Sequence, residues 1–114
     1  MFSHERLDCY QCALKFAALS YHVIAQVPRG NADLQDQLKR ATTSILLNIA
    51  EGAGKATTKE QARFYAIARG STLECAAVLD VLRLQGIVQP ETVARAKETL
   101  MRVAAMLSRM ARLE

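Results

Sequence analysis

Apolar residues recur at alternating spacings of three and four along most of the chain, and breaks interrupt the pattern at 28–31, 52–58 and 86–90. The breaks contain both prolines and four of the five glycines. This spacing is the period of α-helices that pack about 20° from antiparallel. It predicts four helices, at about 4–27, 32–52, 58–86 and 90–112. We therefore expect an all-α, single-domain fold over residues 1–114, an antiparallel up-down-up-down four-helix bundle.

Residues with capping roles stand at the expected ends of the third and fourth helices. Gly86 can adopt the left-handed conformation that ends a helix. Pro90 suits the first position of a helix, where its missing N–H costs nothing. Thr57 and Glu60 have the spacing of a capping box that opens the third helix.

The first helix has more apolar surface than one bundle core needs. Its main seam runs from Leu7 to Ile24, and a second apolar stripe lies about 130° away. A second stripe predicts a second covered surface, most simply another copy of the chain. The expected interface residues are Cys9, Phe16, Val23 and Val27. The polar residues of this helix, within a wedge of about 60°, are Asp8, Gln11, Lys15, His22 and Gln26. The open alternative is a helix sunk between its three neighbours, with no oligomer.

The composition is that of a soluble globular protein, with 51% hydrophobic and 23% charged residues among 114. Aromatic residues make up only 5%, and Trp is absent, which disfavours a sheet protein. No apolar run approaches the ~18 residues of a membrane span, and the start lacks the pattern of a secretory signal. The odd number of cysteines, three, favours reduced thiols. We therefore expect a cytoplasmic protein without a membrane partner.

The strongest sequence signal lies between Gln37 and Glu74. Four runs are informative: YQCAL at 10–14, QLKRA at 37–41, SILLNIAEGAGK at 44–55 and RFYAIARGSTLE at 63–74. Together they resemble the 23S rRNA intervening-sequence proteins, a family of four-helix-bundle proteins, over nearly the whole chain. The departures are small: Lys55 stands where arginine is more usual, Val27 where an aromatic residue is common, and Cys75 where leucine is common.

The resemblance implies a small bacterial protein that assembles into a ring-like homopentamer and has no established enzymatic activity. A more distant likeness is to the accessory protein of diversity-generating retroelements, a basic pentamer that binds nucleic acid and a reverse transcriptase. That likeness is one of fold, and fold alone does not carry function. The residues of the signature that we interpret as structural are Arg40, Asn48, Glu51, Gly52, Gly54, Phe64, Gly70, Ser71 and Glu74.

The polar residues of this signature have a structural explanation and a catalytic one. In the structural one, Arg40 neutralises Glu74 across the second and third helices. Ser71 lets these helices approach, and Asn48 fixes their register through a buried hydrogen bond. In the catalytic one, Glu51 and Glu74 form an acid–base pair or hold a metal. Neither glutamate has the histidine three residues later that metal-binding bundles use. We therefore expect that the protein is not an enzyme, has no catalytic residue and binds no cofactor.

Cys9-x-x-Cys12 has the spacing of redox and zinc sites, but it lies within a helix and lacks a second pair of ligands. His4 and His22, the only histidines, would both have to converge on it. Free cysteines commonly pack as small hydrophobic residues. We expect buried thiols and no metal.

The run Gly52-x-Gly54-Lys55 has a faint likeness to a phosphate-binding loop. Such a loop needs G-x-x-x-x-G-K-[ST] after a strand, and both the spacing and the strand are missing. We interpret the two glycines as residues that end the second helix so that the chain can reverse.

Basic residues outnumber acidic ones by 15 to 11, which gives a net charge of +4. Lys55, Lys59 and Arg63 recur every four residues with only Glu60 among them, so this stripe is the less compensated one. In the last helix, Glu91 and Glu98 precede two arginines by four residues, the pairing of an ordinary solvated face. The candidate phosphate-binding residues are Lys39, Lys55, Lys59, Arg63, Arg95, Arg102, Arg109 and Arg112.

These patterns favour a non-enzymatic, oligomeric protein that binds nucleic acid, RNA rather than DNA, through phosphate contacts. Five copies of a +4 chain would carry about +20, which makes weak patches multivalent. Few aromatic residues accompany the cations, so we do not expect base stacking. The alternative is a ring-shaped scaffold for a partner enzyme, with no role for nucleic acid. An enzyme built on Glu51 and Glu74 is disfavoured because no nucleophile, base and orienting group occur together.

Overall fold

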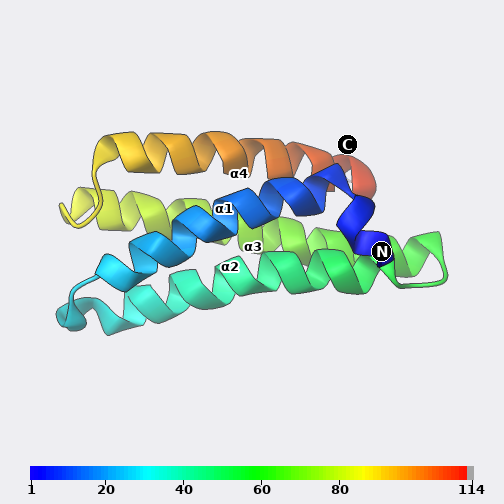
Figure 1. Cartoon of the computed structure of the whole chain (residues 1–114), viewed down its shortest axis with the longest axis horizontal. Coiled ribbons are helices and arrows are strands. Elements are labelled where there is room, and N and C mark those ends of the chain that lie inside the picture. The colour runs from blue at the N-terminus through cyan, green and yellow to red at the C-terminus, as the bar shows by residue number, and fades with distance from the viewer. Residues whose placement is uncertain (113–114) are drawn as a thin grey trace.

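The computed structural model describes residues 1–112 of the 114, and these residues are helical with no strand. Two short 3₁₀ helices, η1 (Ser3–Arg6) and η2 (Arg29–Asn31), precede the first two long helices. The long helices are α1 (Asp8–Gln26), α2 (Ala32–Ala53), α3 (Thr58–Leu84) and α4 (Pro90–Met110) (Figure 1). The all-α, four-helix prediction is confirmed. The N-terminus and the C-terminal end of α4 lie at the same end of the bundle as the α2–α3 connection.

Hydrogen bonds between helices show that each helix runs antiparallel to its neighbours in sequence. Ser44 on α2 bonds Ser71 on α3, while Thr42, earlier on α2, bonds Cys75, later on α3. The same reversal joins α3 to α4 through two pairs, Arg69–Ser108 and Asp80–Lys97. It also joins α4 to α1, through Cys9–Val103 and Cys12–Thr99. The chain therefore goes up, down, up and down, and α4 closes the bundle on α1.

The helix ends agree with the expected capping residues except at the start of α1. Thr57 caps α3, since its Oγ1 accepts a hydrogen bond from the Glu60 N–H at 3.2 Å, and Gly86 follows α3 with φ +75°. Pro90 begins α4. The predicted start of the first helix at residue 4 is wrong, because Leu7 is extended (φ −80°, ψ 126°) and separates η1 from α1. An extended residue cannot continue the i→i−4 ladder.

The second apolar stripe of α1 lies in the core and does not form an outer surface. Cys9, Phe16, Val23 and Val27 are all buried within the single chain, Phe16 with 1% of its surface exposed. The prediction that these four residues form an oligomer interface is therefore wrong. The helical wheel gives the angle between two stripes but not which of them faces the bundle. On the other seam, Leu14 and Tyr21 are partly exposed, at 38% and 39%.

A layer of hydroxyl groups crosses the middle of the core, which the apolar periodicity did not indicate. Ser20 on α1 and Thr42 on α2 are buried, and their hydroxyl oxygens lie 2.7 Å apart. Thr42 also contacts the thiol of Cys75 on α3 at 3.7 Å. Within residues 1–112, every buried side-chain nitrogen or oxygen has a hydrogen-bond partner. Satisfied polar groups of this kind restrict the bundle to one register.

Gly52 serves close packing, whereas Gly54 ends α2. Gly52 lies inside α2, and a Cβ built there would be 2.7 Å from Cε1 of the Tyr65 ring on α3. Gly54 is the C-cap, and its N–H bonds the carbonyls of Ala50 and Glu51. The interpretation of both glycines as chain-reversal residues is thus right for Gly54 and wrong for Gly52.

Candidate nucleic-acid interface

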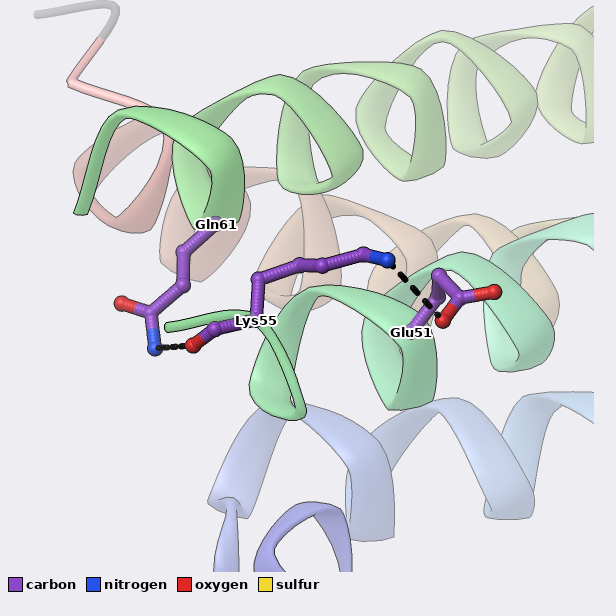
Figure 2. Close-up of polar contacts among 3 residues, drawn as sticks. All are labelled: Glu51, Lys55 and Gln61. Carbon is purple, nitrogen blue, oxygen red and sulfur yellow. Dashed lines mark hydrogen bonds and ion pairs between the residues drawn. The ribbon is translucent and has the colours of Figure 1, made fainter. Parts of the chain in front are cut away.

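Lys55, in the stripe that we expected only Glu60 to compensate, is paired with Glu51 of its own chain. Its Nζ lies 3.6 Å from Oε2 of Glu51 (Figure 2) and 5.1 Å from the centre of the Phe64 ring. The backbone beside it is also held, because Nε2 of Gln61 donates to the Lys55 carbonyl at 3.2 Å. The spacing from Glu51 to Lys55 follows the i,i+4 rule, so the sequence already contained this signal. The expectation that only Glu60 compensates the stripe is wrong.

The other candidates on α2 and α3 do not gather into one patch. Lys59 and Arg63 are exposed at the start of α3, and Arg63 lies with Cζ 5.3 Å from the centre of the Phe64 ring. Lys39 is exposed on α2, where it lines a shallow hollow with Arg40 and other α2 residues. The 16 residues between Lys39 and Lys55 correspond to about 24 Å along a helix. The structure therefore separates Lys39 from the stripe formed by Lys55, Lys59 and Arg63.

The α4 arginines are exposed and, among the carboxylates of residues 1–112, have no partner, contrary to expectation. Within residues 1–112, the ion pairs closer than 4.0 Å are Lys55–Glu51 and Lys97–Asp80. Neither the glutamates of α4 nor other carboxylates in that range therefore neutralise Arg95, Arg102 or Arg109. At seven-residue spacing, successive arginines stand about 10.5 Å apart along one side of the helix. Arg112 is exposed just beyond the end of α4.

Two of these arginines line a groove between α1 and α4. The groove has a volume of about 480 Å³ and also contains Lys15 of α1. Its full lining is Asp8, Gln11, Cys12, Lys15, Arg102, Ala105, Met106 and Arg109. A second hollow, of about 350 Å³, lies between the same two helices nearer the α3–α4 loop. It contains His22, Gln26 and Arg95. The polar wedge of the first helix thus lies along the arginines of the last one, and we call this surface the α1–α4 seam.

Sequence reasoning found the arginines of this seam but missed Lys15. Lys15 belongs to the polar wedge of α1, and nothing in the local sequence connects it with α4. The antiparallel closure of the bundle brings the two together, and the α1–α4 register is fixed by Cys9–Val103 and Cys12–Thr99. The signal that could have found Lys15 is this pairing rule applied to the first and last helices.

The polar residues of the signature bond differently from what we expected. Arg40 and Glu74 are both exposed and form no ion pair within residues 1–112, so the prediction that they neutralise each other is wrong. Nδ2 of Asn48 donates to the carbonyl and hydroxyl oxygens of Ser44 on its own helix, at 2.9 and 3.0 Å. Ser44 then bonds Ser71 on α3 at 2.8 Å. Asn48 is half-buried and acts on the register only through Ser44.

The structure does not bring Glu51 and Glu74 together as a carboxylate pair. Because Ser44 lies opposite Ser71, Glu74 lies opposite about residue 41 of α2. Ten residues separate that level from Glu51, which is about 15 Å along the helix. Glu51 is directed toward Lys55 instead. Glu51 and Glu74 are therefore too far apart to act as an acid–base pair or to hold one metal ion together.

The three thiols are buried, as expected. Cys9 and Cys12 approach the carbonyls of Val103 and Thr99, each at 4.0 Å. Burial raises the pKa of the Cys9 thiol to about 12, with a smaller contribution from Cys12, and burial likewise raises the pKa of Cys75 to about 12. Thiols with such pKa values are poor nucleophiles. Residues 1–112 contain no cluster of three or more His, Cys, Asp or Glu residues that could hold a metal ion.

Fold and surface together define a four-helix-bundle protein whose last helix has a row of exposed arginines, none of them in an ion pair within the described part of the chain. The family model of the 23S rRNA-intervening sequence protein matches residues 5–109. The chain therefore belongs to this family, and the resemblance inferred from its central runs is confirmed. A search among curated proteins finds no match. Within the described part of the chain, no helix has the length and apolar character needed to cross a membrane.

Proposed function

We propose that the protein is a non-enzymatic, self-associating bacterial protein of the cytoplasm that binds RNA through phosphate contacts. The observation that carries this proposal is the row of arginines on α4, Arg95, Arg102 and Arg109, which are exposed and have no carboxylate partner among residues 1–112. Arginines without a carboxylate partner are free to bind phosphate, often with two hydrogen bonds each. The family description refers to sequences within ribosomal RNA, which supports RNA over DNA.

The outward faces of α2 and α3 are the best surface for self-association. Leu47 and Ile67 have 64% and 43% of their surfaces exposed, and they lie on the two helices that the Ser44–Ser71 hydrogen bond joins. Large apolar side chains that gather on one face commonly mark a protein interface. With the residues of the second α1 stripe buried, this face replaces that stripe as the proposed contact between copies, which the family resemblance suggests are five.

The assembly can be tested by light scattering on a sizing column. Leu47→Asp combined with Ile67→Asp is expected to reduce the mass to that of one chain, because it places two charges in the proposed interface. Met101→Asp is the control, since Met101 is more exposed than either residue, at 71%, but lies on α4. A double variant that keeps the wild-type mass would show that copies do not meet at this face.

RNA binding can be tested on the same column with a structured rRNA fragment. Protein and RNA are expected to elute together at ~50 mM salt and to separate by ~200 mM, because phosphate contacts release counterions. The triple variant Arg95→Gln, Arg102→Gln, Arg109→Gln should lose this binding. Lys97→Gln is the control, because Lys97 lies on the same helix and is already paired with Asp80 at 2.9 Å. If the protein is assembled but does not elute with RNA at any salt concentration, the result would instead support the alternative function, a scaffold for a partner enzyme.

A further inference from the structure

Three cations from two helices line one groove of the α1–α4 seam. Lys15 comes from α1, and Arg102 and Arg109 come from α4. None of the three has a carboxylate within 4.0 Å among residues 1–112. The groove contains one carboxylate, that of Asp8, so its net charge is positive. Unpaired cations that share a concave surface raise the local potential more than the same cations on a convex ridge.

The cations are spread along the groove and do not meet at a single point. Cys12 lies beside Thr99, so Lys15 is level with about residue 96, and Arg102 and Arg109 follow at intervals along the groove. The two arginines alone stand about 10.5 Å apart along α4. A separate hollow further along the two helices contains Arg95 and His22. An extended anion with repeated charges fits this arrangement better than one compact ion.

The shape of the groove selects the form of the nucleic acid. At about 480 Å³, the groove has the size of a small-molecule pocket, far smaller than a duplex. A duplex would rest on the rim and meet only the ends of the arginine side chains. A single strand can place its backbone inside, where Ala105 and Met106 give an apolar wall for the sugars. Positively charged grooves that track a backbone are the usual sites for single strands.

We propose that the groove between α1 and α4 binds the backbone of single-stranded RNA, with phosphates on Lys15, Arg102 and Arg109. This inference rests on the proposed function and adds to it the position and the strandedness of the bound RNA. Lys15 is the residue that distinguishes the two proposals, because it lines the groove from α1 and takes no part in the α4 row. Asp8 opposes binding, since it brings a negative charge to the phosphates.

The test uses a fluorescent oligouridylate of about eight nucleotides, within the ~4–16 that single-strand grooves cover. Binding is measured by anisotropy between ~50 and ~200 mM salt, where each phosphate contact adds about 0.7 to the slope of log affinity against log salt. Three contacts predict a roughly 20-fold loss of affinity over this range, and two contacts a roughly sevenfold loss. Lys15→Gln should therefore change the first value into the second, and Asp8→Asn should strengthen binding. Lys97→Gln is the control and should leave the slope unchanged.

An RNA duplex of equal length separates the possible outcomes. Preference for the single strand, together with the reduced slope of Lys15→Gln, supports the groove. If Lys15→Gln has the wild-type slope, or the duplex binds as tightly as the single strand, the groove proposal is overturned. RNA binding through the α4 arginines then stands if the triple arginine variant still loses binding. If neither RNA binds at any salt concentration, both proposals fail.

Discussion

Gly52→Ala is expected to destabilise the bundle, although alanine is the better helix former. A Cβ at Gly52 would lie 2.7 Å from Cε1 and 3.0 Å from Cδ1 of the Tyr65 ring, and 3.2 Å from Cβ of Phe64. Carbon atoms in favourable contact are ~3.5–4.0 Å apart. The Tyr65 ring is buried, with 7% of its surface exposed, so it cannot turn away freely. The substitution must therefore push α2 and α3 apart near the end of α2.

The magnitude follows from two opposing contributions. Alanine gains about 1 kcal/mol over glycine inside a helix. Overpacking in a close-packed core costs about 1–3 kcal/mol, and an overlap with a buried ring belongs in the upper half of that range. We expect a net loss of about 1–2 kcal/mol. Gly54→Ala is the matched control two residues later, because φ is −87° there and a Cβ would make only ordinary contacts, with the carbonyl oxygens of Glu51 at 3.6 Å and Ala50 at 3.8 Å. It should be neutral or stabilise by up to about 1 kcal/mol.

The assay is urea unfolding followed by helical circular dichroism at a fixed protein concentration, since association changes apparent stability. The two glycine variants should differ by about 2 kcal/mol, which is roughly 8 °C in melting temperature for a chain of this size. In a Tyr65→Leu background, Gly52→Ala should cost less, because the ring is gone. If Gly52→Ala and Gly54→Ala are equally stable, the close approach of α2 and α3 does not limit residue 52.

Three further predictions concern stability and use the same unfolding assay. Thr42→Val leaves the Ser20 hydroxyl buried without its partner and should cost about 1–3 kcal/mol; a wild-type midpoint would contradict the hydroxyl layer. Thr57→Ala removes the N-cap of α3 and should cost about 1 kcal/mol. At the urea concentration of the wild-type midpoint, this variant should therefore have a smaller helical signal than the wild-type chain. Because the folded state keeps the protons of Cys9 and Cys75 up to a pKa of about 12, against an ordinary 9.0, stability should fall as pH rises above 9.0. Replacing both cysteines by alanine should flatten that fall.

The periodicity of the chain was enough to predict the four helices, because their apolar faces repeat without interruption between the breaks. It did not predict which face of α1 is buried. Leu14 and Tyr21 belong to the seam with the larger side chains, yet they are partly exposed, while Cys9 and Phe16 are buried. The choice depends on how α1 is rotated against α2 and α4. Part of that rotation is set by the hydroxyl of Ser20, which must reach Thr42 and which a scale of hydrophobicity counts as polar.

The same limit applies to Lys15 in the candidate site. The α4 arginines repeat every seven residues, so their common side is visible in the sequence. Lys15, which shares a groove with Arg102 and Arg109, is 87 positions before Arg102, and no local rule connects the two. Contacts between the first and last helices of a bundle depend on how the bundle closes. The sequence therefore predicted the row of arginines but not the groove that makes it a site.

Local charge spacing gives an opportunity for pairing, and the surroundings decide whether the pair forms. Glutamate precedes a cation by four residues at Lys55, Arg95 and Arg102, and only Lys55 is paired within residues 1–112. The Phe64 ring beside Lys55 holds its ammonium near Glu51. The two arginines instead line the α1–α4 seam, where long side chains bury their apolar stems and leave the guanidinium in water. A cation that lies in such a groove does not pair with the glutamate of its own helix and is available to a ligand. The α4 arginines are therefore a stronger candidate for phosphate binding than the stripe formed by Lys55, Lys59 and Arg63.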